Sequence, residues 1–146
     1  MYKRFIALAS LCAIVGTTTG CASNRATATL MADADLSKVK TLYVVHQVND
    51  KRGVDQDLKT AFEKRGYQVT TGPELKPPYP QDAVVTYVDK WFWDITMYMI
   101  ELTVTVRSPV NDFPLATGNS LHTSLSRKSP PEMADEVVGN IVNAKH

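Results

Sequence analysis

The sequence predicts an α+β fold, a two-layer sandwich in which a mixed sheet of about five strands carries helices on one face. The first observation behind this prediction is the order of the elements: a strand, a helix and a strand, then a three-stranded antiparallel meander, then a helix. The second is that both helical segments have an apolar stripe, which each must bury against the sheet. A right-handed crossover makes the first two strands parallel if they are neighbours.

The first strand, helix and strand are predicted from composition and spacing. Residues 41–48 are rich in β-branched and aromatic side chains and almost continuously apolar, which predicts a central strand. Over residues 54–65 apolar side chains recur at helical spacing, with acidic residues in the first turn and basic residues in the last. Gly66 ends this helix. Residues 67–71 form a second strand, and a rigid Pro-rich loop follows at 72–80.

The second half of the chain predicts the meander and the last helix. Residues 83–91 form the third strand, and the aromatic stretch 91–94 marks its end. In the fourth strand, 95–107, the even positions form the core face and the odd positions the other face. A fifth, half-exposed strand covers 115–127, and residues 129–132 form a capping box with Ser first and Glu three later. The apolar stripe of the last helix consists of Met133, Ala134, Val137, Val138, Ile141 and Val142.

Residues 1–20 are typical of a secretory signal peptide. Two basic residues precede an apolar run at 5–15, which is too short to span a bilayer. A stretch of small residues then ends in Gly20 and Cys21. This ending resembles the lipobox of bacterial lipoproteins, in which a small residue and then Gly or Ala precede a lipidated cysteine.

The lipobox resemblance implies a covalent anchor. Cys21 would receive a diacylglycerol on its sulfur, cleavage would follow Gly20, and the new amino group would be acylated with a fatty acid such as palmitate. Ala22 rather than Asp follows the cysteine, which favours the outer membrane with the domain on the periplasmic side. The alternative is a plain secreted protein cleaved near Ala22, in which Cys21 has no role. Cys12 follows a bulky residue and is interpreted as part of the apolar run.

Removal of residues 1–20 would change the composition. The full chain has 146 residues and a net charge of +1, whereas the remainder has 14 basic and 15 acidic residues. Neither form has the clustered basic excess typical of nucleic-acid binding. With Cys12 removed and Cys21 lipidated, the domain would have no thiol for a disulfide or a metal. The predicted organisation is a signal peptide, a lipidated flexible tether at 21–35 and one domain at 36–146.

Short motifs in the predicted domain occur in a characteristic order. Ser37-Lys38-Val39-Lys40-Thr41 opens the first strand, Gly66-Tyr67 follows the first helix, and Leu115-Ala116-Thr117-Gly118 lies late in the sheet. In this order they resemble a broad group of small, uncharacterised Gram-negative lipoprotein domains. The predicted topology is also similar to the N-terminal domain of the Tol-system protein TolB. This resemblance implies an envelope protein and transfers no catalytic residues, because the group has none that are agreed.

Few residues suggest catalysis or metal binding. The three histidines lack the spacing of a metal site, so no metal site is predicted. Ser120, His122 and Ser124 alternate along one strand, and Asp89 or Asp94 could complete a hydrolytic arrangement. A solvated strand face is the favoured interpretation, because a serine nucleophile needs a base within hydrogen-bond reach and a built oxyanion hole. A hydrolase is therefore the least favoured function.

The aromatic stretch is the most unusual local feature. Trp91 and Trp93 share one strand face, which Met97 and Met99 of the next strand continue. If exposed, this face would be an apolar patch of residue types common at interaction sites. The alternative is that helices or the Pro-rich loop cover it. The favoured function is therefore a lipid-anchored envelope protein with a non-enzymatic role in binding an envelope protein or in self-association. No cofactor or small-molecule substrate is expected.

A second candidate function uses the same two tryptophans. Asp89 and Asp94 flank the aromatic stretch, and carboxylates beside aromatic rings are typical of a glycan-binding cleft. The alternative function is therefore a module that binds cell-wall glycan. The competing structural interpretation is that Lys90 or Arg107 pairs with these acids while the rings close the end of the core.

Overall fold

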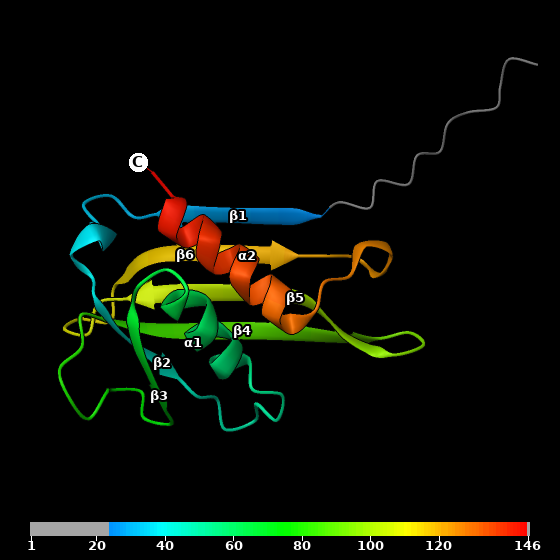
Figure 1. Ribbon diagram of the computed structural model, residues 1–146, viewed down its shortest axis with the longest axis horizontal. Coiled ribbons are helices and arrows are strands. Elements are labelled where there is room, and N and C mark those ends of the chain that lie inside the picture. The colour runs from blue at the N-terminus through cyan, green and yellow to red at the C-terminus, as the bar shows by residue number, and fades with distance from the viewer. Residues whose placement is uncertain (1–23, 146) are drawn as a thin grey trace, which may run out of the picture.

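The computed structural model describes residues 24–145, which form a six-stranded mixed sheet with two helices packed on one face (Figure 1). The predicted fold class is confirmed, with six strands rather than about five. The signal peptide, Gly20 and Cys21 lie outside the described residues. The elements are β1 (Arg25–Leu30), η1 (Leu36–Lys38), β2 (Thr41–Val45), α1 (Val54–Glu63), β3 (Gln68–Gly72), β4 (Ala83–Trp93), β5 (Met97–Arg107), β6 (Pro114–Leu121), η2 (Ser124–Ser126) and α2 (Pro130–Asn143).

The strand order across the sheet is β1-β6-β5-β4-β2-β3. β2 lies between β3 and β4 and is parallel to both, as its almost continuous apolar sequence predicted for an interior strand. The β2-α1-β3 unit is the expected crossover between parallel neighbours. The remaining pairs are antiparallel, as expected for a meander. In the described part of the chain, no helix has both the length and the hydropathy that crossing a bilayer would require.

β1 corrects the expectation of a flexible tether at 21–35. Residues 25–30 pair antiparallel with β6 along their whole length, so the domain begins before residue 36. Ala28 and Leu30 pack against the core. The alternation of Thr and Ala in this segment resembles a linker in composition, because an edge strand that adds little to the core needs few large apolar side chains.

The core lies between the helices and one face of the sheet. The predicted stripes of α1 and α2 are buried, apart from Val142, which is partly buried. The predicted capping box of α2 is confirmed, with the Glu132 carboxylate accepting from the Ser129 amide at 2.8 Å. The helix can approach β6 closely at Gly118, because a Cβ there would lie 2.7 Å from Cγ1 of Ile141.

The opposite face of the sheet is polar around β5 and β6, whereas over β2 and β4 it carries a small buried cluster of Tyr43, Val45 and Val84. Glu101 of β5 accepts hydrogen bonds from Lys90 at 2.6 Å, from Asn119 at 2.8 Å and from Arg25 at 3.2 Å. The hydrogen bonds from Lys90 and then from Asn119 lower the pKa of Glu101, so it stays ionised at neutral pH. Since neighbouring strands supply these partners, this face needs no second layer of helices.

We predict that Gly118→Ala destabilises the domain by about 1–3 kcal/mol, because the added methyl group would collide with α2. The measurement is urea unfolding followed by circular dichroism. Thr29→Ala on the exposed face of β1 is the control and should change stability by less than about 0.5 kcal/mol. Equal stability of the Gly118 variant and the wild type would contradict the close contact between α2 and β6.

Candidate functional site

A bulge in the β4–β5 hairpin decides which β5 residues lie opposite the aromatic side chains of β4. Lys90 of β4 pairs with Glu101 of β5, and the next β4 residue, Trp91, pairs with Met99. Ile100 of β5 therefore has no partner residue in β4, and the register of the two strands shifts there. The expected even-odd alternation of the fourth strand therefore holds only beyond the bulge. Before it, the odd position Met99 faces the helices instead.

The four residues of the predicted Trp–Met surface separate into two pairs. Met99 is 1% exposed and belongs to the core, and Trp91 packs against that core. The Arg52 guanidinium covers the Trp91 ring at 4.2 Å from its centroid. Trp93 and Met97 pair with each other nearer the hairpin tip, where Trp93 is 63% exposed. Only this outer pair is available for contact with another molecule.

Arg127 holds the hairpin tip against the segment before α2. Its guanidinium donates to the carboxylate of Asp94 and to the Thr96 hydroxyl, the latter at 2.8 Å, and lies 4.0 Å from the centroid of the Tyr98 ring. Hydrogen bonds from the Ile95 amide and from Arg127 lower the pKa of Asp94. Sequence reasoning missed this cation, because 33 residues separate it from its partner.

The two carboxylates of the proposed glycan cleft are already engaged. Asp89 accepts from the indole nitrogen of Trp91, and Asp94 binds Arg127. The expected partners Lys90 and Arg107 bind other carboxylates instead: Lys90 pairs with Glu101, and Arg107 with Asp112 at 3.8 Å. Arg52 also covers the Trp91 ring. The structure therefore lacks the pair of exposed indole rings beside two unpaired carboxylates that the glycan-binding hypothesis requires.

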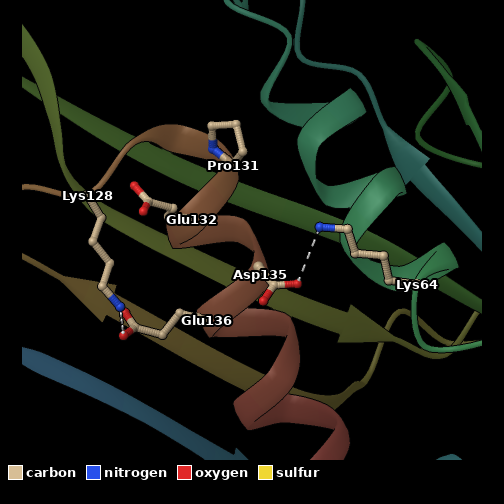
Figure 2. Close-up of a pocket in the computed structure, with 6 residues that line it drawn as sticks. All are labelled: Lys64, Lys128, Pro131, Glu132, Asp135 and Glu136. Atoms are coloured by element: carbon tan, nitrogen blue, oxygen red, sulfur yellow. Dashed lines mark hydrogen bonds and ion pairs between the residues drawn. The ribbon is translucent and has the colours of Figure 1, made fainter.

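Ser120 and His122 meet at a carboxylate that the sequence interpretation did not consider. The Glu136 carboxylate of α2 lies 2.5 Å from Oγ of Ser120 and 2.7 Å from Nε2 of His122. It also accepts from Lys128, and Figure 2 shows this last contact. Burial raises the pKa of Glu136, but the hydrogen bonds from Lys128, Ser120 and His122 outweigh it and lower this pKa to about 2.

This arrangement differs from that of a hydrolase. Ser120 is fully buried and donates to Glu136 rather than to His122, so it lacks the serine–histidine hydrogen bond of the arrangement considered from the sequence. Because an ionised carboxylate only accepts, Nε2 of His122 donates its proton to Glu136. Asp89 and Asp94 have other partners, and Ser124 lies in the η2 turn. The Ser120-His122-Glu136 group joins β6 to α2.

The hollow beside Glu136, drawn in Figure 2, is lined by charged groups that are paired with one another. Lys128 binds Glu136, and Asp135 binds Lys64 at 4.0 Å and Arg65 at 2.9 Å. The second Arg65 nitrogen donates to the Asp135 carbonyl at 2.9 Å. These contacts fasten α1 to α2, and they leave little charge free for a ligand.

A second acidic group follows the carboxyl end of β2. His46, Asp50 and Asp55 place one ligand atom each within 4.8 Å of the others. Asp50, however, accepts from the backbone amides of residues 52–55 and from the hydroxyl of Tyr87 at 2.8 Å. Because a carboxylate has about four acceptor positions, Asp50 is saturated. Asp50 therefore caps the N-terminus of α1, and Asp55 pairs with His46 at 3.2 Å. These contacts explain why the three side chains lie together.

A groove of about 670 Å³ lies at the end of the sheet away from the hairpin tip, between the Pro-rich loop and the β5–β6 loop. Leu75 and Pro77 line one side, and Val110 lines the other. Arg107, which donates to Thr86 at 3.1 Å, also lines it. Sequence reasoning missed this feature, because it forms only where two loops from separate parts of the chain meet.

Comparisons with known proteins place the fold. Models of known protein families give no match, and curated proteins give none either. Among solved structures, the PelC dodecamer from Paraburkholderia phytofirmans is 13% identical and matches 82% of this chain and 96% of the PelC chain, with a TM-score of 0.58. A PDZ domain protein from Parabacteroides distasonis is 11% identical and matches 83% of this chain and 36% of that chain, with a TM-score of 0.53.

TolB from Acinetobacter baumannii also matches, at 13% identity over 82% of this chain and 31% of that chain. Its TM-score of 0.47 is too low to support an argument. At these identities the likeness to PelC and to the PDZ domain protein shows a shared fold and nothing about activity.

We predict that Glu136→Gln lowers stability at pH 7 by about 1–3 kcal/mol, because charge-assisted hydrogen bonds to Lys128 and His122 are weakened. The folded-state pKa of about 2 lies below the ordinary value of 4.5, so the contribution of Glu136 is complete above pH 4.5 and is lost as the pH falls towards 2. The variant should therefore lose less stability over this interval. Urea unfolding at several pH values measures it.

The control for this prediction is Glu63→Gln, which removes a carboxylate that forms an exposed ion pair with Lys59. It should change stability by less than about 0.5 kcal/mol. If the Glu136 variant lost as much stability as the wild type between pH 4.5 and pH 2, the ionised network would not be the cause.

Proposed function

We propose that this protein is an envelope lipoprotein whose domain assembles with further copies of its own chain and catalyses no reaction. Lipid on Cys21 would hold it at the outer membrane, on the periplasmic side. Apart from that lipid, the proposal includes no cofactor, metal, nucleic acid or small-molecule substrate. The observation that carries the assembly role is the apolar surface at the groove end of the sheet.

This groove-end surface consists of large apolar side chains on two loops. Val110 is 92% exposed, and Leu75, Tyr79 and Phe113 are exposed as well. Contiguous exposed apolar surface marks interaction sites in soluble domains. A second copy is the proposed occupant because PelC, which shares the fold over nearly its whole chain, is a dodecamer.

The non-enzymatic role is supported by how the candidate catalytic groups are used. Ser120 and His122 both bind Glu136, and Asp94 binds Arg127. Ser120 thus donates to a carboxylate and not to an imidazole base, and each of these pairs joins two elements of the fold. Glycan binding by the two tryptophans is disfavoured for a separate reason: the Arg52 guanidinium covers the Trp91 ring.

The anchor is supported by the signal sequence and its Gly-Cys ending. One acyl chain binds membranes only marginally, whereas two or more anchor a protein stably. The outer membrane is favoured because Ala22 rather than Asp follows Cys21.

The anchor predicts that cells supplied with labelled palmitate label the wild-type chain and Cys12→Ser but not Cys21→Ser. The two variants form a matched pair, because the chain has only these two cysteines. Gel electrophoresis of the immunoprecipitated chain measures the label. Label on the Cys21 variant, or none on the wild type, would contradict the anchor.

The assembly role predicts that the full chain in mild detergent is oligomeric by light scattering and by native mass spectrometry. Val110→Asp should weaken this association by about tenfold or more, because it places a charge in an apolar contact. Val48→Asp, an equally exposed valine on the β2–α1 loop towards the opposite end of the sheet, is the matched control and should assemble like the wild type. A wild-type chain that is monomeric at all concentrations would overturn the assembly role.

A further inference from the structure

We propose that the hairpin end of the domain docks on the bilayer that holds the Cys21 lipid, with an apolar cluster inserted at the interface. This hairpin-end cluster consists of Phe92, Trp93, Ile95, Met97 and Leu125. The inference rests on the proposed anchor, and it adds a second membrane contact that fixes the orientation of the domain.

The first argument is the length of chain between the anchor and the domain. Cys21 precedes Asn24 by three residues, so their Cα atoms lie at most about 11 Å apart. Asn24 is held against the η2 segment, since its side-chain oxygen accepts from Ser126 Oγ at 2.5 Å and from the Thr123 amide at 3.4 Å. A lipid on Cys21 therefore brings the η2 turn close to the membrane surface.

The second argument is the set of contacts that joins the η2 turn to the hairpin tip. Leu125, in the middle of η2, is 90% exposed. Arg127, just after this turn, binds Asp94 and Thr96 at the tip of the β4–β5 hairpin. The start of β1, the η2 turn and the hairpin tip lie at the same end of the sheet (Figure 1). The anchor, the turn and the hairpin therefore share one end of the domain.

The third argument is the chemistry of this end. Ile95 at the hairpin tip is 86% exposed, and the indole of Trp93 is exposed beside it. Tryptophan is enriched at the level of lipid headgroups, and exposed Ile, Leu, Met and Phe side chains gain from transfer into the acyl boundary. Because the chain is already tethered there, these side chains need only a modest gain to stay inserted.

The charges near the cluster indicate that docking is apolar rather than electrostatic. Arg25 and Lys90 both pair with Glu101, and Arg127 pairs with Asp94. Apart from Lys51 and Arg52 of the β2–α1 loop, whose Arg52 guanidinium lies over Trp91, these cations are paired with carboxylates, which limits the charge available to anionic headgroups. We therefore expect docking to depend little on the fraction of anionic lipid. In the docked orientation, the groove-end surface lies at the end of the sheet away from the membrane, where further copies can reach it.

The test uses the two tryptophans as separate reporters. The chain contains only Trp91 and Trp93, so Trp91→Phe leaves Trp93 as the sole indole and Trp93→Phe leaves Trp91. The full lipidated chain is reconstituted in phosphatidylethanolamine–phosphatidylglycerol vesicles with plain or brominated acyl chains. Circular dichroism checks that each variant is folded, and the mass of the N-terminal peptide shows whether Cys21 is acylated.

Docking predicts that brominated lipid lowers Trp93 emission by about twofold or more, while Trp91, covered by Arg52 and packed on the core, is quenched much less. Iodide in the buffer should quench Trp93 weakly. Ile95→Asp in the Trp91→Phe background should restore Trp93 emission and its access to iodide, whereas Val110→Asp at the groove end should leave both unchanged.

The outcomes separate the two proposals. An acylated chain whose Trp93 is open to iodide and not quenched by brominated lipid overturns docking and leaves the anchor intact. An acylated chain whose Trp93 is shielded from both quenchers indicates that protein covers this surface, which also overturns docking. A chain without acyl groups on Cys21 overturns the anchor, and with it the docking that depends on it.

Discussion

The structure depends on burying two amphipathic helices against a single face of one sheet. Leu58 and Phe62 of α1 and Val137 and Ile141 of α2 are almost completely buried against the strands, and Gly118 lets α2 approach β6 closely. Burial of this apolar surface is the dominant favourable contribution to folding. Because the helices occupy only one face, the other must be stable in contact with solvent. The hydrogen bonds that converge on Glu101 meet that requirement around β5, and over β2 the Pro-rich loop contacts the buried Tyr43 ring through Tyr79 and Glu74.

The exposed apolar side chains gather at the two ends of the sheet, beyond the one-sided core. The charged and nucleophilic groups along the strands and helices are paired internally: Glu136 with His122, Asp94 with Arg127, and Asp50 with the amides of α1. Such pairs stabilise the fold and occupy the titratable groups that join its helices and strands. The exposed features that remain are apolar side chains at the hairpin tip and on the loops beside the groove. This distribution is typical of a domain that acts through contacts with other surfaces.

Together, the proposed anchor and the proposed roles of these two ends would give the domain one orientation at the membrane. The segment before β1 is short, and Asn24 is held against η2, so the anchored end and the hairpin end coincide. Copies anchored in this way would be confined to one surface and would present their groove ends at similar height. Both effects favour lateral association over association in solution, because anchoring removes part of the entropy that assembly must otherwise overcome.

The sequence alone determined the features whose physical causes are local. The stripes of the helices follow from apolar spacing, the capping box from residues three apart, and the interior position of β2 from its apolar run. The proposed anchor at Cys21 is likewise an interpretation of a short local motif, Gly20-Cys21. Tertiary structure decided the rest. β1 became a strand because β6, about 90 residues later, supplies its hydrogen bonds. The bulge after Met99 placed Met97 and Met99 opposite Trp93 and Trp91, and of the two methionines only Met99 reaches the core. The partners of Glu136 and Asp94 likewise come from distant segments. Periodicity and capping act within a few residues, whereas strand register and ion pairing depend on which segments meet once the chain is folded.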